Sequence, residues 1–143
     1  MLLRFTKMHG QSNDFMVIDL VTQHAQLSPR MMHQWSDRRT GIGFDKVLIV
    51  EPPGSPEADL RYCTFDTEGN ELPPCSDGIR CFTRFVQDKR LTSKPEIHLE
   101  TSAGSLTLLI RRDYQVSIQP AGPDWPALLT GPATRVYEGQ IRV

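Results

Sequence analysis

The sequence has no long apolar run and no excess of charge of either sign. No segment approaches the roughly 18 consecutive apolar residues that a membrane span requires. The 16 Lys and Arg residues are balanced by 17 Asp and Glu residues, for a formal net charge of −1. The start of the chain also lacks the apolar core and cleavage site of a signal peptide. We therefore expect a cytoplasmic protein that has neither a nucleic acid nor a membrane as its partner.

Cysteine is scarce as well. The three cysteines are Cys63, Cys75 and Cys81, and an odd number argues against a secreted disulfide framework. Their spacing matches no zinc pattern, and the four histidines lie far from them in the sequence. We expect no metal site, and a small buried side chain is the ordinary role for each cysteine.

The 143 residues suit a single domain, and their apolar pattern indicates more strand than helix. Alternation and short apolar runs predict about eight strands, over residues 2–8, 15–20, 47–51, 59–65, 96–101, 105–111, 114–119 and 134–142. Ser28 and Pro29 are typical of a helix start, and they predict a helix over residues 29–37. The sum predicts an α+β fold, with a curved and mostly antiparallel sheet around a second helix that follows Cys75.

That second helix carries the sharpest chemical signal. Its apolar stripe is formed by Ile79, Phe82, Phe85 and Val86, at spacings of three and four residues. Cys75 stands where this helix begins, and the free N–H groups of a helix start stabilise a thiolate or hold a carboxylate. A thiol beside a bound carboxylate is suited to removing a proton from the carbon next to that carboxylate. The alternative is that Cys75 is a structural residue only.

Five segments, in order, resemble diaminopimelate epimerases. Residues 9–15 (HGQSNDF) resemble HGxGNDF, residues 41–45 match GIGFD, and residues 65–71 (FDTEGNE) resemble FNADGSE. Residues 75–86 (CSDGIRCFTRFV) resemble CGNGARCFARFV, and residues 130–143 resemble the C-terminal end of that family. The similarity covers residues 1–119 and 126–143. Residues 120–129 form a proline-rich linker between these two parts.

The resemblance implies a fold, a chemistry and a missing part. Enzymes of this family have two similar domains, each a sheet around a central helix with one cysteine at its start. One thiolate removes the α-proton, the other thiol protonates the opposite face, and no cofactor is used. The present chain resembles the first domain alone, closed by the C-terminal strand, so residues 1–143 are expected to form one domain. Cys75 matches one catalytic cysteine, whereas Cys81 is expected to pack in the core.

The expected ligand site departs from the family pattern. By resemblance, the substrate-binding positions are Asn13, Lys46, Asp66, Ser76, Asp77 and Gly78. Asp77 and Asp66 stand where the family has asparagines, and Lys46 stands where it has glutamine. Asp77 is expected to repel a substrate carboxylate and to oppose a thiolate at Cys75. A new ligand is the alternative: Lys46 would pair with its acidic group, and the two aspartates would hold its amine.

Two functions therefore remain open. In the first, the chain is a truncated epimerase relative that lacks epimerase activity as a monomer and is a binding, interaction or vestigial protein. In the second, two copies face each other across a two-fold axis, and each contributes one Cys75 to a cofactor-independent isomerase. Both readings predict a small amino-acid ligand and a homo-oligomer formed through the exposed former interdomain face.

Overall fold

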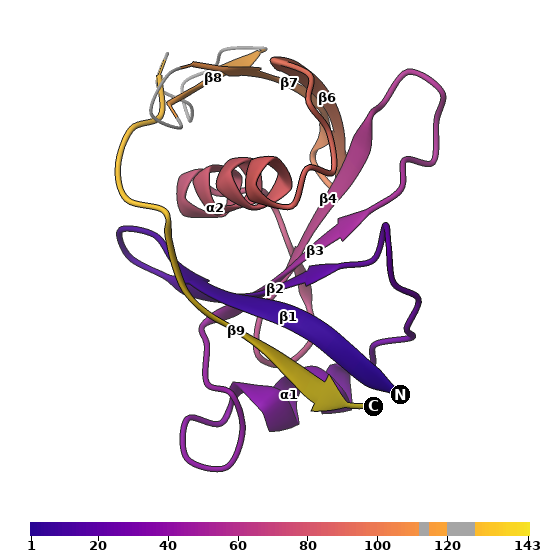
Figure 1. Ribbon diagram of the computed structural model, residues 1–143, viewed down its shortest axis with the longest axis vertical. Helices are drawn as coiled ribbons and strands as arrows, with labels where there is room; N and C mark the ends of the chain where they lie inside the picture. The colour runs from indigo at the N-terminus through magenta and orange to yellow at the C-terminus, as the bar shows by residue number, and fades with distance from the viewer. Residues whose placement is uncertain (112–114, 120–127) are drawn as a thin grey trace.

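The computed structural model describes residues 1–111, 115–119 and 128–143 (Figure 1). Most of the predicted linker and the start of the strand predicted at residue 114 lie outside these ranges. The strands are β1 (Leu2–His9), β2 (Asp14–Asp19), β3 (Lys46–Glu51), β4 (Leu60–Phe65), β5 (Glu71–Leu72), β6 (Glu96–Thr101), β7 (Gly104–Ile110), β8 (Val116–Gln119) and β9 (Thr134–Arg142). The helices are α1 (Pro29–Ser36) and α2 (Ser76–Asp88).

All the strands belong to one sheet in the order β8-β7-β6-β4-β3-β2-β1-β9, with β5 paired to β4. The pairs are antiparallel except β2 with β3 and β4 with β6. The predicted α+β fold with a mostly antiparallel sheet is confirmed. The strand that the sequence pattern missed is β5, whose two residues are too few to show an alternation.

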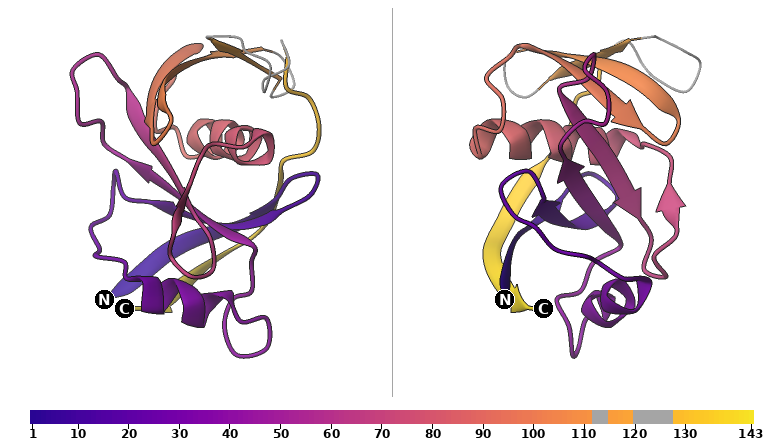
Figure 2. Two further views of the ribbon diagram at one scale, coloured as in Figure 1. Left: turned by 180° about the vertical axis from the view of Figure 1, so that it is seen from behind. Right: turned by 90° about the vertical axis from the view of Figure 1, so that its right-hand side faces the viewer.

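The sheet curves around α2. In Figure 1, β6, β7 and β8 arch over one side of this helix while β1, β2 and β9 pass along the other, and Figure 2 shows the same enclosure from two further sides. The predicted stripe of Ile79, Phe82, Phe85 and Val86 is buried in the core between helix and sheet. Cys81 is buried in the same core, so its predicted packing role is confirmed.

The shorter helix α1 covers the outer face of β1, β2 and β3 (Figure 1). Ser28 caps it by accepting a hydrogen bond from the Met31 N–H group at 3.2 Å, and Pro29 occupies its first turn, as the sequence indicates. Met32 and Trp35 pack into a second core on this face. The sheet is therefore buried on both faces near its middle.

The last strand, β9, forms one edge of the sheet. β9 runs antiparallel to β1 along the whole length of that strand, from the pair Leu2–Arg142 to the pair His9–Thr134. The two chain ends consequently lie side by side, and the Val143 N–H group donates to the Met1 carbonyl oxygen at 2.9 Å. Neither helix in the described ranges has the length and apolar character that crossing a membrane would require.

Candidate active site around Cys75

Cys75 is the residue that caps the start of α2. Its backbone is extended, with φ −127° and ψ 160°, which suits a residue that follows two prolines and precedes a helix. Its Sγ atom accepts a hydrogen bond from the Gly78 N–H group at 3.3 Å, in the way that a serine oxygen would act as a cap. The side chain is partly exposed. The sulfur is therefore held at the positive end of the helix and within reach of solvent.

Lys46 brings a positive charge to this sulfur. It is the first residue of β3, directly after the glycine-containing loop at residues 41–45. Its Nζ atom lies 3.8 Å from Cys75 Sγ, so the predicted site residues Lys46 and Cys75 are brought together. An ammonium group at this position would attract an anionic ligand group to the sulfur. Because the two atoms are neighbours, they would also meet a bound ligand from the same side.

Gly78 lies against Tyr62 and Cys75, and there is no room for a side chain at this position. A Cβ atom built on it would lie 2.1 Å from Tyr62 Oη and 3.2 Å from Cys75 Sγ. Tyr62 is buried, and its hydroxyl has no hydrogen bond of acceptable geometry within the described part of the chain. Glycine at this position therefore lets the start of α2 pack directly against the Tyr62 side chain.

Asp77 is used differently from what we expected. It is 4% exposed, and its carboxylate faces the turn at residues 9–14 rather than open solvent. The N–H groups of Gln11, Ser12 and Asn13 donate to it at 3.1, 2.7 and 3.0 Å. Arg80 pairs with it from one helical turn along. Both carboxylate oxygens are thus engaged, and Asp77 holds the turn against the helix.

The electrostatics of Asp77 follow from these contacts. Burial alone would raise the pKa of its carboxyl group, but the N–H groups of Ser12 and Gln11, the amide of Asn13 and the charge of Arg80 outweigh that effect. The net result is a pKa below the usual value. The resemblance places the negative charge of Asp77 beside a substrate carboxylate, but groups of the protein itself already compensate this charge.

Arg80 is a residue of this site that the sequence analysis missed. It is buried, and its Nη1 atom donates to the Thr130 carbonyl oxygen at 3.0 Å in addition to the pairing with Asp77. It thereby ties the start of α2 to the segment that leads into β9. The spacing of three residues between an aspartate and an arginine on one helix was the available signal.

The remaining predicted positions separate into two groups. Asn13 joins the cluster through Asp77, to which its Nδ2 atom donates at 3.2 Å. Ser76 is the first residue of α2, beside Cys75, and is partly exposed. Asp66 instead accepts hydrogen bonds from the N–H groups of Glu68 and Asn70, both at 2.9 Å, and so shapes its own turn between β4 and β5. Ligand binding by these residues stays a prediction.

A second set of charges fixes the two loops beside the site. The Arg38 guanidinium forms two hydrogen bonds of 2.9 Å with the carboxylate of Asp14 and reaches Asp45 at 3.3 Å. Lys7 Nζ lies 3.2 Å from the same Asp14 carboxylate. Burial would raise the pKa of Asp14, yet the hydrogen bonds with Arg38, Asp45 and Lys7 and the charge of Lys7 hold it well below its usual range. Asp14 and Asp45 belong to the two glycine-containing motifs, so this network joins those motifs.

The other two thiols are unsuited to chemistry at this site. Cys63 is buried in the outer core and donates to Glu51 Oε1 at 3.2 Å. Burial raises the pKa of the Cys63 thiol to about 12, and it raises that of the Cys81 thiol to about 12 as well. Cys75 is the one cysteine of the sequence that is not buried. Within the described ranges, no cluster of His, Cys, Asp or Glu side chains is arranged to hold a metal ion.

Solved structures identify the class of fold. The crystal structure of methylitaconate-delta-isomerase matches with a TM-score of 0.70 over 99% of this chain and 95% of that one, at 14% identity. A hydroxyproline epimerase from Agrobacterium vitis matches with a TM-score of 0.60 over 82% of this chain and 41% of that one, also at 14% identity. A sheet wrapped around a helix is thus the fold of isomerase and epimerase domains.

The sequence comparison narrows the class to one family. The profile of diaminopimelate epimerase matches residues 5–123. Over 123 residues the chain is 58% identical to the diaminopimelate epimerase of Azotobacter vinelandii, which covers 86% of this chain and 45% of that relative. The chain belongs to the diaminopimelate epimerase family. It spans about half the length of the curated relatives that it matches.

Proposed function

We propose that this chain binds an amino acid at a site of the diaminopimelate epimerase type, whose proton-transfer groups lie on one side of the ligand. We propose that the monomer therefore binds its ligand without inverting the configuration of the α-carbon. The ligand is a small amino acid of the diaminopimelate class, a proposal that the similarity to diaminopimelate epimerases supports. The setting that we propose is lysine biosynthesis in the cytoplasm. Its α-carboxylate is drawn to the Lys46 ammonium and the helix start, which leaves the α-carbon facing Cys75 Sγ.

The observation that carries this proposal is the position of the accessible thiol relative to its neighbour. Inversion at a carbon atom needs one group that removes a proton and another that delivers a proton to the opposite face. Cys75 and Lys46 lie within 3.8 Å of each other, so both approach a ligand from one side. Cys63 and Cys81 are buried and take no part. The described part of the chain therefore supplies proton-transfer groups for one face of the ligand.

Protection of Cys75 from alkylation tests the binding part. Iodoacetamide labels Cys75 selectively because the other two thiols are buried, and mass spectrometry follows the labelling rate. We expect LL-diaminopimelate to slow the labelling in a saturable way and 1,5-diaminopentane, which lacks the carboxylates, to leave it unchanged. Equal labelling with and without diaminopimelate would show that the site binds no amino acid of this class.

A homodimer is the second candidate, favoured by the partial exposure of Cys75 at the rim of the domain. Two chains related by a two-fold axis through the former interdomain face would place one Cys75 on each side of a shared ligand. Heavy-water exchange of the α-hydrogen of diaminopimelate tests this arrangement. The dimer hypothesis requires exchange by dimeric protein and its loss in Cys75→Ala. It also requires that mixing the wild-type and Cys75→Ala chains lowers the activity of the wild-type chain, because mixed dimers hold a single thiol.

A further inference from the structure

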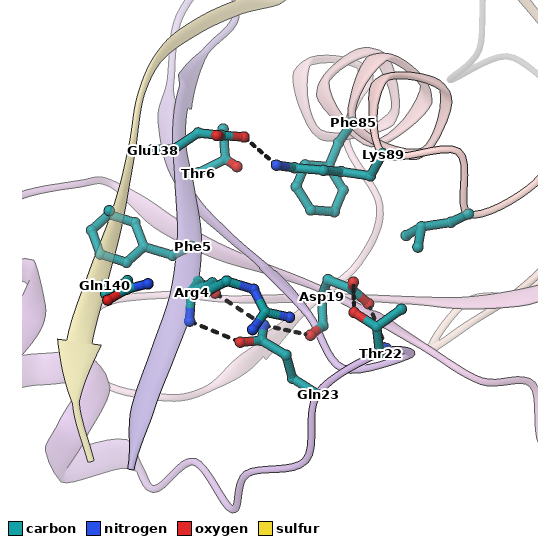
Figure 3. A pocket seen from close by; sticks show the side chains of 12 residues that line it. Arg4, Phe5, Thr6, Asp19, Thr22, Gln23, Phe85, Lys89, Glu138 and Gln140 are labelled. Carbon is teal, nitrogen blue, oxygen red and sulfur yellow. Dashed lines mark hydrogen bonds and ion pairs between the residues drawn. The ribbon is translucent and has the colours of Figure 1, made fainter.

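A cavity lies at the far end of α2 from Cys75. It has a volume of about 480 Å³, is partly open to solvent, and is lined by β1, β9, the end of α2 and the segment at residues 19–23 (Figure 3). Cys75 caps the start of this 13-residue helix, whereas Phe85 and Lys89 line the cavity from its other end. At 1.5 Å per residue, the helix separates the two places by roughly 15–20 Å. The cavity is therefore distinct from the candidate active site.

The cavity exists because the helix ends before the sheet does. Side chains two residues apart on a strand share a face, so Arg4, Thr6 and Met8 of β1 all point to the α2 side. Met8 is covered by the core around α2, but Arg4 lies beyond the last turn of the helix. The side chains on the α2 side of β1 thus change from apolar to polar at the point where α2 no longer covers the strand.

Arg4 supplies a positive charge that nothing in the described part of the chain neutralises. Its guanidinium has no hydrogen bond or ion pair there, although its backbone N–H and C=O groups are both bound by the Gln23 side chain, at 2.8 and 3.1 Å. In Figure 3 the side chain extends from β1 toward the segment that carries Gln23. The backbone at Arg4 is therefore fixed while its charged group is left available.

Thr6 supplies a second available polar group. The residue is 1% exposed, and its hydroxyl has no hydrogen-bond partner among the described residues. Figure 3 shows Thr6 and the ring of Phe85 at the same cavity, on β1 and α2 respectively.

The other charged groups of the lining already have partners. Lys89 pairs with Glu138 across the mouth of the cavity (Figure 3). The Asp19 carboxylate accepts hydrogen bonds from the N–H groups of Val21 and Thr22 and from the Thr22 hydroxyl, so it is turned into its own loop. Among the described residues that line the cavity, a ligand therefore meets the Arg4 guanidinium, the Thr6 hydroxyl and an apolar wall made by Phe85 and Leu91.

We propose that this cavity binds a small aromatic carboxylate. The carboxylate would take two parallel hydrogen bonds from the Arg4 guanidinium, the ring would pack on Phe85 and Leu91, and the Thr6 hydroxyl would donate to the carboxylate or to a ring substituent. The volume fits one ring with a short acidic arm, within the range of small-molecule sites. This site does not depend on Cys75 or on the function proposed above.

Phenylacetate is a suitable probe, with uncharged phenylacetamide as its matched control, and binding is followed by titration of the amide resonances of the protein. We expect saturable shifts around β1 and the end of α2, with a dissociation constant on the order of 1 mM for so small a ligand. Phenylacetamide should bind at least about tenfold more weakly, because it offers no charge to Arg4. Equal binding of the two probes, or no saturable shift up to about 20 mM phenylacetate, would overturn the proposal.

Variants locate the site. Arg4→Gln should weaken phenylacetate binding about tenfold, and Thr6→Val should weaken it severalfold. Arg142→Gln makes the same charge change on β9 outside the cavity lining and should leave binding unchanged, as should Cys75→Ala. Thermal unfolding of each variant verifies that it is folded. Equal weakening by Arg4→Gln and Arg142→Gln would show a nonspecific charge effect and would contradict the proposed site.

Discussion

Lys46 Nζ and Cys75 Sγ lie 3.8 Å apart, although 29 positions separate the two residues in the sequence. The contact joins the first residue of a central strand to the cap of the buried helix. By resemblance, the family has glutamine where Lys46 stands, so this chain places a full charge where an uncharged amide is expected. The contact therefore distinguishes this site from the family pattern, and substitution of Lys46 tests its effect on Cys75 directly.

Lys46→Gln should slow the alkylation of Cys75. The thiolate is the form of the sulfur that attacks an electrophile, and a neighbouring ammonium group favours this anion more than the uncharged amide of glutamine would. We expect the rate of reaction with iodoacetamide at pH 7 to fall by roughly threefold to tenfold. Lys94→Gln is the matched control, because Lys94 pairs with Asp59 at 2.7 Å, away from the site. An unchanged rate in Lys46→Gln would show that the lysine does not influence the thiol.

Asp77→Asn should destabilise the protein even though it restores the family residue. An amide has one acceptor oxygen, so its NH₂ group would face backbone N–H groups that now donate to a carboxylate, and Arg80 would lose its charged partner. We expect a loss of about 1–3 kcal/mol in the free energy of unfolding, measured by urea titration. Glu57→Gln removes an exposed charge and should be neutral. A fully stable Asp77→Asn would mean that the carboxylate is not needed to hold the turn.

Gly78→Ala and Tyr62→Phe should be coupled. Alanine at position 78 would drive its Cβ atom against Tyr62 Oη, and we expect a cost of about 1–3 kcal/mol despite the better helix propensity of alanine. Tyr62→Phe alone removes a hydroxyl without a well-formed hydrogen bond and should be close to neutral. Thermal and urea unfolding of the four proteins completes a double-mutant cycle. Additive effects, with no rescue of Gly78→Ala by Tyr62→Phe, would contradict the predicted clash.

The contacts of Asp14 predict how stability depends on pH. Its pKa in the folded protein lies below the ordinary value of 3.8, so the folded state binds fewer protons than the unfolded state at acid pH. The stabilisation is therefore fully present above pH 3.8 and is lost as the pH falls below that value, toward the pKa of the folded state.

Arg38→Gln tests this dependence. The side chain of Arg38 is half-exposed, so we expect the variant to lose only about 1 kcal/mol at pH 7. The difference in the free energy of unfolding between wild type and the variant should stay constant down to about pH 4. Below that pH the difference should become smaller, as Asp14 becomes protonated. Arg39→Gln, at the neighbouring exposed position, should show no such trend. Urea titrations at several pH values measure the difference, and a deficit that is independent of pH down to pH 2 would contradict the assignment to Asp14.

Local patterns predicted the elements of the fold well. The apolar stripe of α2 gave its buried face, and the alternation at residues 96–101 and 134–142 gave the bounds of β6 and β9 as the structure has them. These features depend on neighbours within a few residues, which a sequence displays directly. β5 was missed because two residues carry no period.

The candidate site was harder to predict because its contacts join distant segments. The resemblance selected Cys75 and Lys46, but nothing in the order of the residues shows that their side chains meet. Asp77 was expected to act on a ligand, yet it contacts a turn about 65 positions away. Arg38 likewise pairs with Asp14 across 24 positions. Such pairings are set by how the strands and loops come together, and so they become visible only in three dimensions.

The central claim is that one chain offers proton-transfer groups to one face of its ligand only. The most direct test is the rate at which LL-diaminopimelate becomes the meso isomer, followed by chiral chromatography at chain concentrations where light scattering shows monomer. We predict that no meso isomer forms beyond the level seen with Cys75→Ala. Formation of the meso isomer by monomeric wild-type protein, at a constant rate per chain and lost in Cys75→Ala, would contradict the claim.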